Sequence, residues 1–145
     1  MSSITNAMGG VTSFTYDAAG NLLSTTDTMG GVTSNVYDVN GNLTSTTDAV
    51  GNTTSYTYDK LGRALSITDA NGGVTYAQYD ANGNIVKTTD PEGNVTSYTY
   101  DARNQLTSYT DAEGYTFFYT YDGNGNVVSE TDGNGNTTRY VYDGL

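Results

Sequence analysis

Aromatic and hydroxyl-bearing positions alternate along the whole chain and are interrupted at regular intervals by polar turn residues. In the segment 51–58, Tyr56 and Tyr58 fall on one face of an extended strand, and Ser55 and Thr57 fall on the other. Fourteen Tyr, abundant Thr and Val, and a single Pro favour strands, because branched and aromatic side chains fit a half-buried sheet surface. The pattern predicts an all-β fold.

A second kind of strand, which returns after each aromatic strand, carries one aliphatic residue at a constant phase. We expect these residues to join the aromatic face, while Thr and Ser form most of the other face. They are Leu22, Leu43, Ala64, Ile85, Leu106 and Val127.

The sequence repeats with a period of 21 residues, without insertion or deletion. A Tyr-Asp pair marks each repeat: Tyr16-Asp17, Tyr37-Asp38, Tyr58-Asp59, Tyr79-Asp80, Tyr100-Asp101, Tyr121-Asp122 and Tyr142-Asp143. Such regularity is typical of units that stack, since each unit must present the same edge to the next. Residues 1–145 are therefore predicted to be a single array of 21-residue repeats, with partial repeats at both ends.

Each repeat contains two turns. A second Asp series has the same period: Asp27, Asp48, Asp69, Asp90, Asp111 and Asp132. Three residues after the Asp of either series stands Gly20, Gly30, Gly41, Gly51, Gly62, Gly72, Gly83, Gly93, Asn104, Gly114, Gly125 or Gly135. Asp at the first position of a turn accepts a backbone hydrogen bond, and Gly or Asn at the fourth tolerates a left-handed conformation. These residues are thus predicted to be structural.

The turns alternate at spacings of 10 and 11 residues, which leaves strand-sized runs between them. We predict a repetitive antiparallel β-hairpin meander of roughly fourteen strands, with three-residue loops and bulges, that forms a curled or spiralling ribbon. At about 4.8 Å per strand, a flat ribbon would be on the order of 65 Å long with an uncovered aromatic face, so it must curl, stack or find a partner. The alternative is a parallel β-solenoid with one 21-residue repeat per coil.

Charge and composition exclude several function classes. A formal net charge of −11 disfavours nucleic acid and anionic lipid as partners, and no segment is apolar for long enough to span a bilayer. The chain has no Cys and no His, so it lacks disulfides and the commonest general base and transition-metal ligand. Ser and Thr then have no activating partner, and the Asp residues share one local context, unlike the paired carboxylates of a glycosidase. The prediction is no enzyme, no catalytic residue and no cofactor.

The pattern G-x-x-T-x-Y-x-Y-D-x-x-G-N/R-L resembles the YD repeats of the RHS family, which occur also in Tc-type toxin complexes and teneurins. The seven Tyr-Asp pairs carry this resemblance over essentially the whole chain, and Gly62-Arg63 comes closest to the family's usual Gly-Arg. The resemblance implies a β-ribbon that spirals into a hollow cocoon, often around a toxic C-terminal domain. The family's core motif and toxin domain are missing here, and six repeats are too few to close such a cocoon.

Two ligand hypotheses stand beside the structural interpretation. Three turns resemble the front of a calcium loop: Asp38, Asn40 and Asn42; Asp80, Asn82 and Asn84; and Asp122, Asn124 and Asn126. A complete calcium loop needs further oxygens, so a structural turn is favoured over a metal site. The Tyr rows could bind sugar by stacking, but Tyr recurs in every repeat, without a local cluster to mark a pocket, and sheet packing is favoured.

The function predicted is therefore structural. The chain is expected to be a segment of an RHS-type shell or a subunit that assembles head to tail into a filament, because it starts within a returning strand and stops as the next turn begins at residues 143–145. Its partners would be copies of itself or neighbouring repeats of a larger chain. A carbohydrate- or cell-surface-binding module is the alternative. An extracellular or cell-surface location is expected, although the first ten residues do not form a signal peptide.

Overall fold

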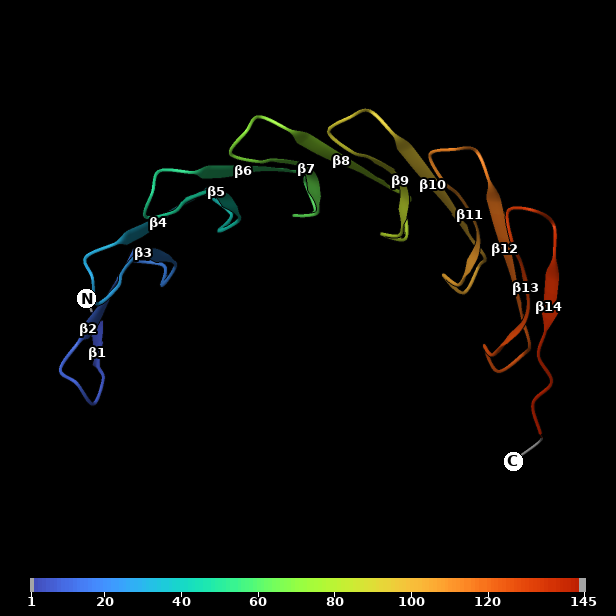
Figure 1. The fold of residues 1–145 in the computed structure, drawn as a ribbon, viewed down its shortest axis with the longest axis horizontal. Helices are drawn as coiled ribbons and strands as arrows, with labels where there is room; N and C mark the ends of the chain where they lie inside the picture. The colour runs from blue at the N-terminus through green and yellow to red at the C-terminus, as the bar shows by residue number, and fades with distance from the viewer. Residues whose placement is uncertain (1, 144–145) are drawn as a thin grey trace. The chain divides into compact units, whose positions relative to one another are not determined.

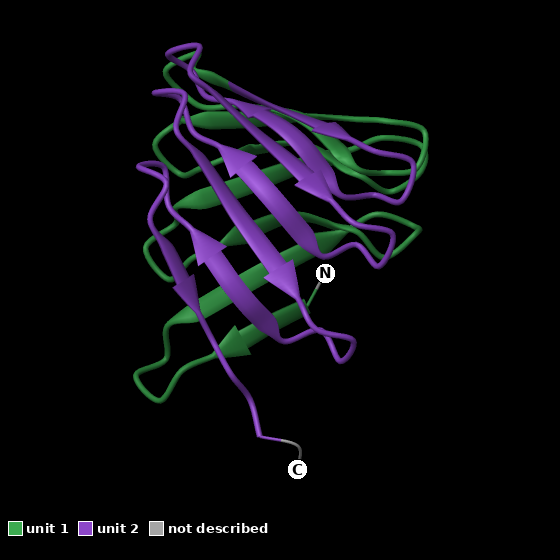
Figure 2. Ribbon diagram, turned by 90° about the vertical axis from the view of Figure 1, so that its right-hand side faces the viewer, with its two compact units in different colours: residues 1–74 green, residues 75–145 purple. Residues whose placement is uncertain are grey.

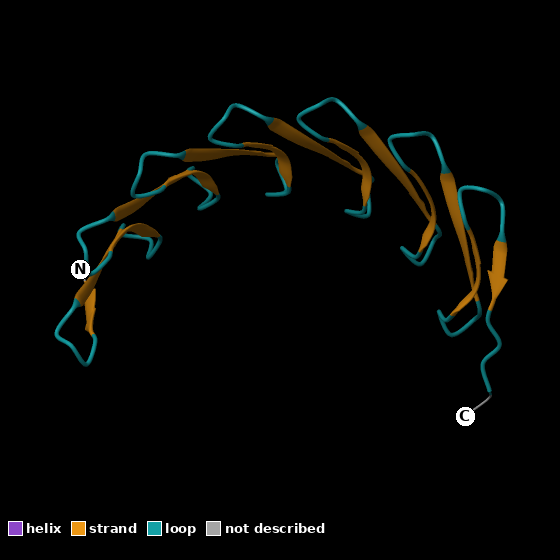
Figure 3. Ribbon diagram, in the orientation of Figure 1, coloured by secondary structure: helices purple, strands orange, loops and turns teal. Residues whose placement is uncertain are grey.

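The structure is a computed structural model that describes residues 2–143. Within these residues all regular structure is strand and turn, and no helix is present that could cross a membrane (Figure 3). The strands are β1 (Ser2–Thr5), β2 (Val11–Tyr16), β3 (Leu22–Thr26), β4 (Val32–Tyr37), β5 (Leu43–Thr47), β6 (Thr53–Tyr58), β7 (Ala64–Thr68), β8 (Val74–Tyr79), β9 (Ile85–Thr89), β10 (Val95–Tyr100), β11 (Leu106–Thr110), β12 (Thr116–Tyr121), β13 (Val127–Thr131) and β14 (Thr137–Arg139).

The strands form one sheet in which their order follows the chain from β1 to β14. The pairings are antiparallel, as in the β1–β2 and β13–β14 pairs, so the hairpin meander is confirmed and the parallel solenoid is wrong. The chain divides into two compact units, residues 1–74 and 75–145 (Figure 2). Within each unit successive hairpins change direction gradually, so the ribbon is curled as expected (Figure 1).

Each hairpin whose two strands are joined by a Tyr-Asp turn contains a bulge in its second strand. In the β2–β3 pair, Thr15 lies opposite Ser24, but Tyr16 lies opposite Leu22, so Leu23 has no partner. The same shift occurs in the β4–β5, β6–β7, β8–β9, β10–β11 and β12–β13 pairs. The second kind of turn causes no shift, as the β3–β4 pair shows.

This bulge explains why the repeat has an odd number of residues. Side chains alternate between faces, so an odd period would exchange the two faces at every repeat of a regular meander. One extra residue per repeat reverses the alternation once, which restores the phase. Phe14 therefore shares a face with its partner Thr25, which pairs on its other side with Thr33.

The sheet lacks a buried core in the residues that the structure describes. None of these residues is fully buried, and even the aliphatic Leu22 opposite Tyr16 is half-buried. Backbone ladders and cross-strand pairs, rather than a second layer, must hold each unit together. Hydroxyl pairs join the strands on the Thr and Ser face, such as Thr15 with Ser24 at 2.6 Å and Thr57 with Ser66 at 2.6 Å.

Candidate functional site

Three features could serve a function: the aspartate turns, the tyrosine hydroxyls between hairpins, and a ring cluster in the second unit.

The turn at Asp48 represents the aspartate turns. Asp48 Oδ1 accepts hydrogen bonds from the backbone N–H groups of Val50 and Asn52, both at 2.9 Å, and its Oδ2 accepts one from Nδ2 of Asn52 at 2.8 Å. The N–H of Gly51 donates to the carbonyl of Asp48 at 3.1 Å. The carboxylate therefore closes its own loop.

The fourth turn position requires a left-handed backbone. Gly51 has φ of 95°, and among residues 2–143 Asn104 is the non-glycine residue with positive φ, 61°. Asn104 can thus replace Gly at the fourth turn position, because its short polar side chain tolerates the left-handed region. The other Gly residues at this position have φ between 77° and 95°.

Hydrogen bonding lowers the pKa of eight turn aspartates below the ordinary 3.8. In seven of them the largest cause is the side-chain N–H of an Asn four residues later, followed by backbone N–H groups. For Asp59 the backbone N–H of Arg63 is the largest cause, and Nε of Arg63 also donates to the carboxylate at 2.6 Å. These groups are charged at neutral pH and engaged with their own turns.

Each weak calcium triad lies within a single turn. Asp38 Oδ1 accepts from the N–H groups of Asn40 and Asn42 at 2.9 Å, and Oδ2 accepts from Nδ2 of Asn42 at 2.8 Å. Asp80 with Asn82 and Asn84, and Asp122 with Asn124 and Asn126, repeat this arrangement. The described residues contain no group of three or more acidic side chains placed to hold a metal ion. The carboxylates point to their own loop donors instead of a common centre.

At several Tyr-Asp pairs, among them those of Tyr37, Tyr58, Tyr121 and Tyr142, a tyrosine hydroxyl joins its strand to the preceding hairpin. The hydroxyl of Tyr37 donates to the carbonyl of Leu22 at 3.0 Å, across the β3–β4 pair, and Tyr58 donates likewise to Leu43 at 2.8 Å. In the second unit, Tyr121 donates to Leu106 at 2.7 Å and Tyr142 to Val127 at 2.9 Å. In these four bonds the acceptor is the first residue of a bulged strand, so each of these tyrosines stabilises the contact between two repeats.

Aromatic rings gather in the second unit, contrary to the expectation of no local cluster. Tyr109 stacks on Phe117 with ring centroids 4.5 Å apart, and Tyr98 and Tyr119 each lie 6.4 Å from Tyr109. The signal was present in the sequence. The position of Tyr109 is occupied by Thr or Ile in the four full repeats before it. The position of Phe117 is occupied by Thr in the other repeats. Tyr109 and Phe117 thus both depart from the repeat consensus. They form the cluster because the β11–β12 pairing places them opposite each other.

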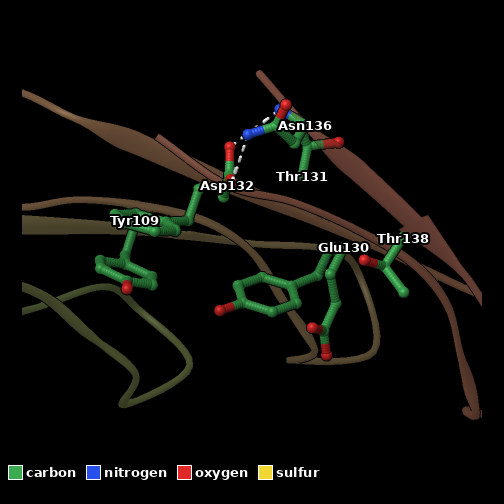
Figure 4. A pocket seen from close by; sticks show the side chains of 8 residues that line it. Tyr109, Glu130, Thr131, Asp132, Asn136 and Thr138 are labelled. Atoms are coloured by element: carbon green, nitrogen blue, oxygen red, sulfur yellow. Dashed lines mark hydrogen bonds between the residues drawn. The ribbon is translucent and has the colours of Figure 1, made fainter. Parts of the chain in front are cut away.

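A hollow of 340 Å³ opens beside these rings (Figure 4). Its lining comes from β11, β12, β13, β14 and the turn that joins the last two strands. It consists of Tyr109, Phe117, Tyr119, Glu130, Thr131, Asp132, Asn136 and Thr138. Sugar binding by the Tyr rows stays a hypothesis, the alternative to sheet packing. A second hollow of similar size in the first unit lies between two Tyr-Asp turns and includes Asn42, Asp59 and Lys60.

Comparison with known proteins identifies the repeat. The family model described as Teneurin YD-shell matches residues 3–144. The chain is similar to the crystal structure of TcdB2-TccC3, with 25% identity and a TM-score of 0.70, over 84% of this chain and 7% of that one. A Photorhabdus luminescens Tc holotoxin pore with a TccC3 mutation shares the fold, with 22% identity and a TM-score of 0.51, over 89% of this chain and 9% of that one. Among curated protein sequences, none matches significantly.

Proposed function

This chain belongs to the teneurin YD-shell family, and on that premise we propose that it is a non-catalytic segment of a β-ribbon wall. It spans less than a tenth of the length of the two solved chains described above, which supports a part in a larger wall. Its partners are then neighbouring repeats of a longer chain. An extracellular or cell-surface location follows from the same family relationship.

The contact between successive hairpins is the observation that carries this proposal. Each Tyr-Asp tyrosine described above binds a carbonyl of the preceding repeat, while each turn aspartate binds its own loop. The tyrosine hydroxyls thus attach one repeat to the next, and the aspartates hold the turns within each repeat. Such nearest-neighbour contacts let a ribbon be extended by adding units.

A duplication of one repeat tests this function. Residues 48–68 inserted again after Thr68 would keep the turn register, because Asp48 and Asp69 occupy the same repeat position. The longer chain should be more stable to denaturant, and X-ray scattering should show a ribbon extended by about 10 Å, the width of two strands. A control insertion with the same 21 residues shuffled should destabilise the chain. If the true duplication destabilises it equally, the wall function is wrong.

Assembly of copies edge to edge is a second candidate. In the described residues β1 pairs with β2 alone and β14 with β13 alone, so each has an edge able to accept another strand. A head-to-tail contact of this kind generates a filament when it does not close. Filaments seen by electron microscopy, together with sedimentation that rises with concentration, would support it. A discrete species at all concentrations would favour the wall segment.

A further inference from the structure

Glu130 differs from every other acidic residue of the described chain, because it lies within a strand. The Asp residues from Asp17 to Asp132 and the other two Glu residues, Glu92 and Glu113, lie in turns. Glu130 pairs with Tyr119 of β12 on one side and with Thr138 of β14 on the other. Glu130, a half-buried residue, thereby lies on the aromatic face of the sheet.

Aromatic residues line the same hollow as Glu130. Tyr119 is its cross-strand partner, Tyr109 and Phe117 stack beside Tyr119, and the hydroxyl of Tyr140 donates to Oε2 of Glu130 at 3.2 Å. Burial raises the pKa of Tyr119 and of Tyr140, and the nearby charge of Glu130 contributes to both shifts. Figure 4 shows Glu130 and Thr138 on one side of the hollow and Tyr109 on the other.

Of the two carboxylates that line the hollow, Glu130 has more acceptor capacity to spare than Asp132. Asp132 Oδ1 accepts from the backbone N–H groups of Asn134 at 3.0 Å and Asn136 at 2.8 Å, and its Oδ2 accepts from Nδ2 of Asn136 at 2.9 Å. Glu130 accepts the single hydrogen bond from Tyr140. A carboxylate beside aromatic faces attracts a cation both by charge and through the ring quadrupoles.

We propose that this hollow binds a positively charged side chain, Arg or Lys, of a polypeptide. The volume of 340 Å³ accommodates the aliphatic stem against the rings while the charged group reaches Glu130. The net charge of −11 makes a basic segment the complementary partner. This assignment does not depend on the wall function.

The repeat supplies its own negative control. The other residues at the repeat position of Glu130 are Ile4, Thr25, Thr46, Ile67, Thr88 and Tyr109, so a carboxylate occurs there only in the last repeat. Thr46 lies opposite Asn35 in the first unit, with no aromatic partner in that pair. A carboxylate placed at position 46 should therefore bind no cation. This variant distinguishes a site that needs both the carboxylate and the rings from one that needs the carboxylate alone.

Nuclear magnetic resonance titration of the full chain with N-acetylarginine amide tests the proposal. Saturable shifts are expected at the amides of Tyr109, Tyr119, Glu130 and Thr138, with weak affinity. N-acetylcitrulline amide, the neutral isostere, should bind about tenfold more weakly or not at all. Nα-acetyllysine amide, which keeps its charged side chain, should bind at the same residues.

Three variants complete the test, each checked for unchanged β-sheet circular dichroism. Glu130→Gln should reduce the affinity for N-acetylarginine amide about tenfold. Glu113→Gln removes an equal charge from a turn and should leave this affinity unchanged. Thr46→Glu should create no second site.

The proposal is overturned if citrulline binds as well as arginine, if Glu113→Gln weakens binding as much as Glu130→Gln, or if no saturable shift occurs. A neutral methyl glycoside that binds the same residues independently of Glu130 would identify a sugar site instead. Equal affinity for tetramethylammonium would show that compact cations, not side chains, are the ligands.

Discussion

The two units share one backbone and differ in what their aromatic face presents. In the first unit, the β4–β5 hairpin pairs Asn35 with Thr46 on this face, and in the second unit the β10–β11 hairpin pairs Tyr98 with Tyr109 at the same repeat positions. The turns and bulges are nevertheless the same in both units. The comparison shows that the turns and ladders specify the ribbon, while residues on its faces can change without loss of the fold.

Acid should have the largest effect, and it should affect the two units alike. Each unit has four aspartates with lowered pKa: Asp17, Asp38, Asp48, Asp59, Asp80, Asp90, Asp122 and Asp132. Because the folded pKa lies below the unfolded value of 3.8, the stabilisation is complete above the unfolded pKa and is lost as pH falls through the folded pKa. Denaturant midpoints measured from pH 7 to pH 2 should be constant and then fall together in both units.

One substitution checks the cause of this acid sensitivity. Asn52→Gly removes the side chain that donates to Asp48 and recreates the Asp27 turn, which has Gly31 at the equivalent position. The pKa of Asp48, followed by carboxyl carbon resonances, should rise toward 3.8. A pKa that does not move would mean that the side-chain hydrogen bond is not what lowers it.

Turn glycines should come next in size, again equally in both units. Gly51→Val and Gly114→Val place a branched side chain at φ of 95° and 89°, where no atom lies within 4 Å of the added Cβ. The cost is therefore backbone strain, about 2 kcal/mol or more of unfolding free energy in each case. Urea unfolding measures it. Asn104→Gly is the control and should be neutral or stabilising, because Asn104 already has positive φ.

The ring cluster should distinguish the units. Tyr109→Thr introduces the residue that stands at the equivalent position 46, and it should cost about 1–2 kcal/mol, since stacked rings contribute beyond the area they bury. Thr46→Ala at the matched position of the first unit should change stability by less than about 0.5 kcal/mol. Equal effects in thermal or urea unfolding would show that the cluster does not stabilise the second unit.

The smallest effect is expected for the tyrosine hydroxyls. Tyr58→Phe and Tyr121→Phe each remove one hydrogen bond to a carbonyl and should lower the unfolding free energy by about 1 kcal/mol. Tyr100 provides the matched control, because its hydroxyl has no such bond within residues 2–143. If Tyr100→Phe is as destabilising as the other two, the hydroxyl bonds do not account for the loss.

Local residue chemistry predicted most of this ribbon. The Asp and Gly spacing located the turns from Asp17 to Gly135, and the alternation of Tyr with Thr located the strands between them; the turn predicted after Tyr142 extends outside the described residues. Turn conformation depends on residues within five positions of one another, so a single sequence contains the needed signal. The resemblance to YD repeats, carried by the same residues, is confirmed by the family match.

Tertiary structure decided what depends on register between strands. The sequence alone determined a 21-residue antiparallel repeat, but not which residue of Leu22 and Leu23 would be left without a partner, a choice that keeps the two faces in phase. It also did not place Tyr109 on Phe117 or Glu130 beside Tyr119. Those contacts join different strands, and a shift of one residue would send each side chain to the opposite face, so only the assembled sheet brings them together.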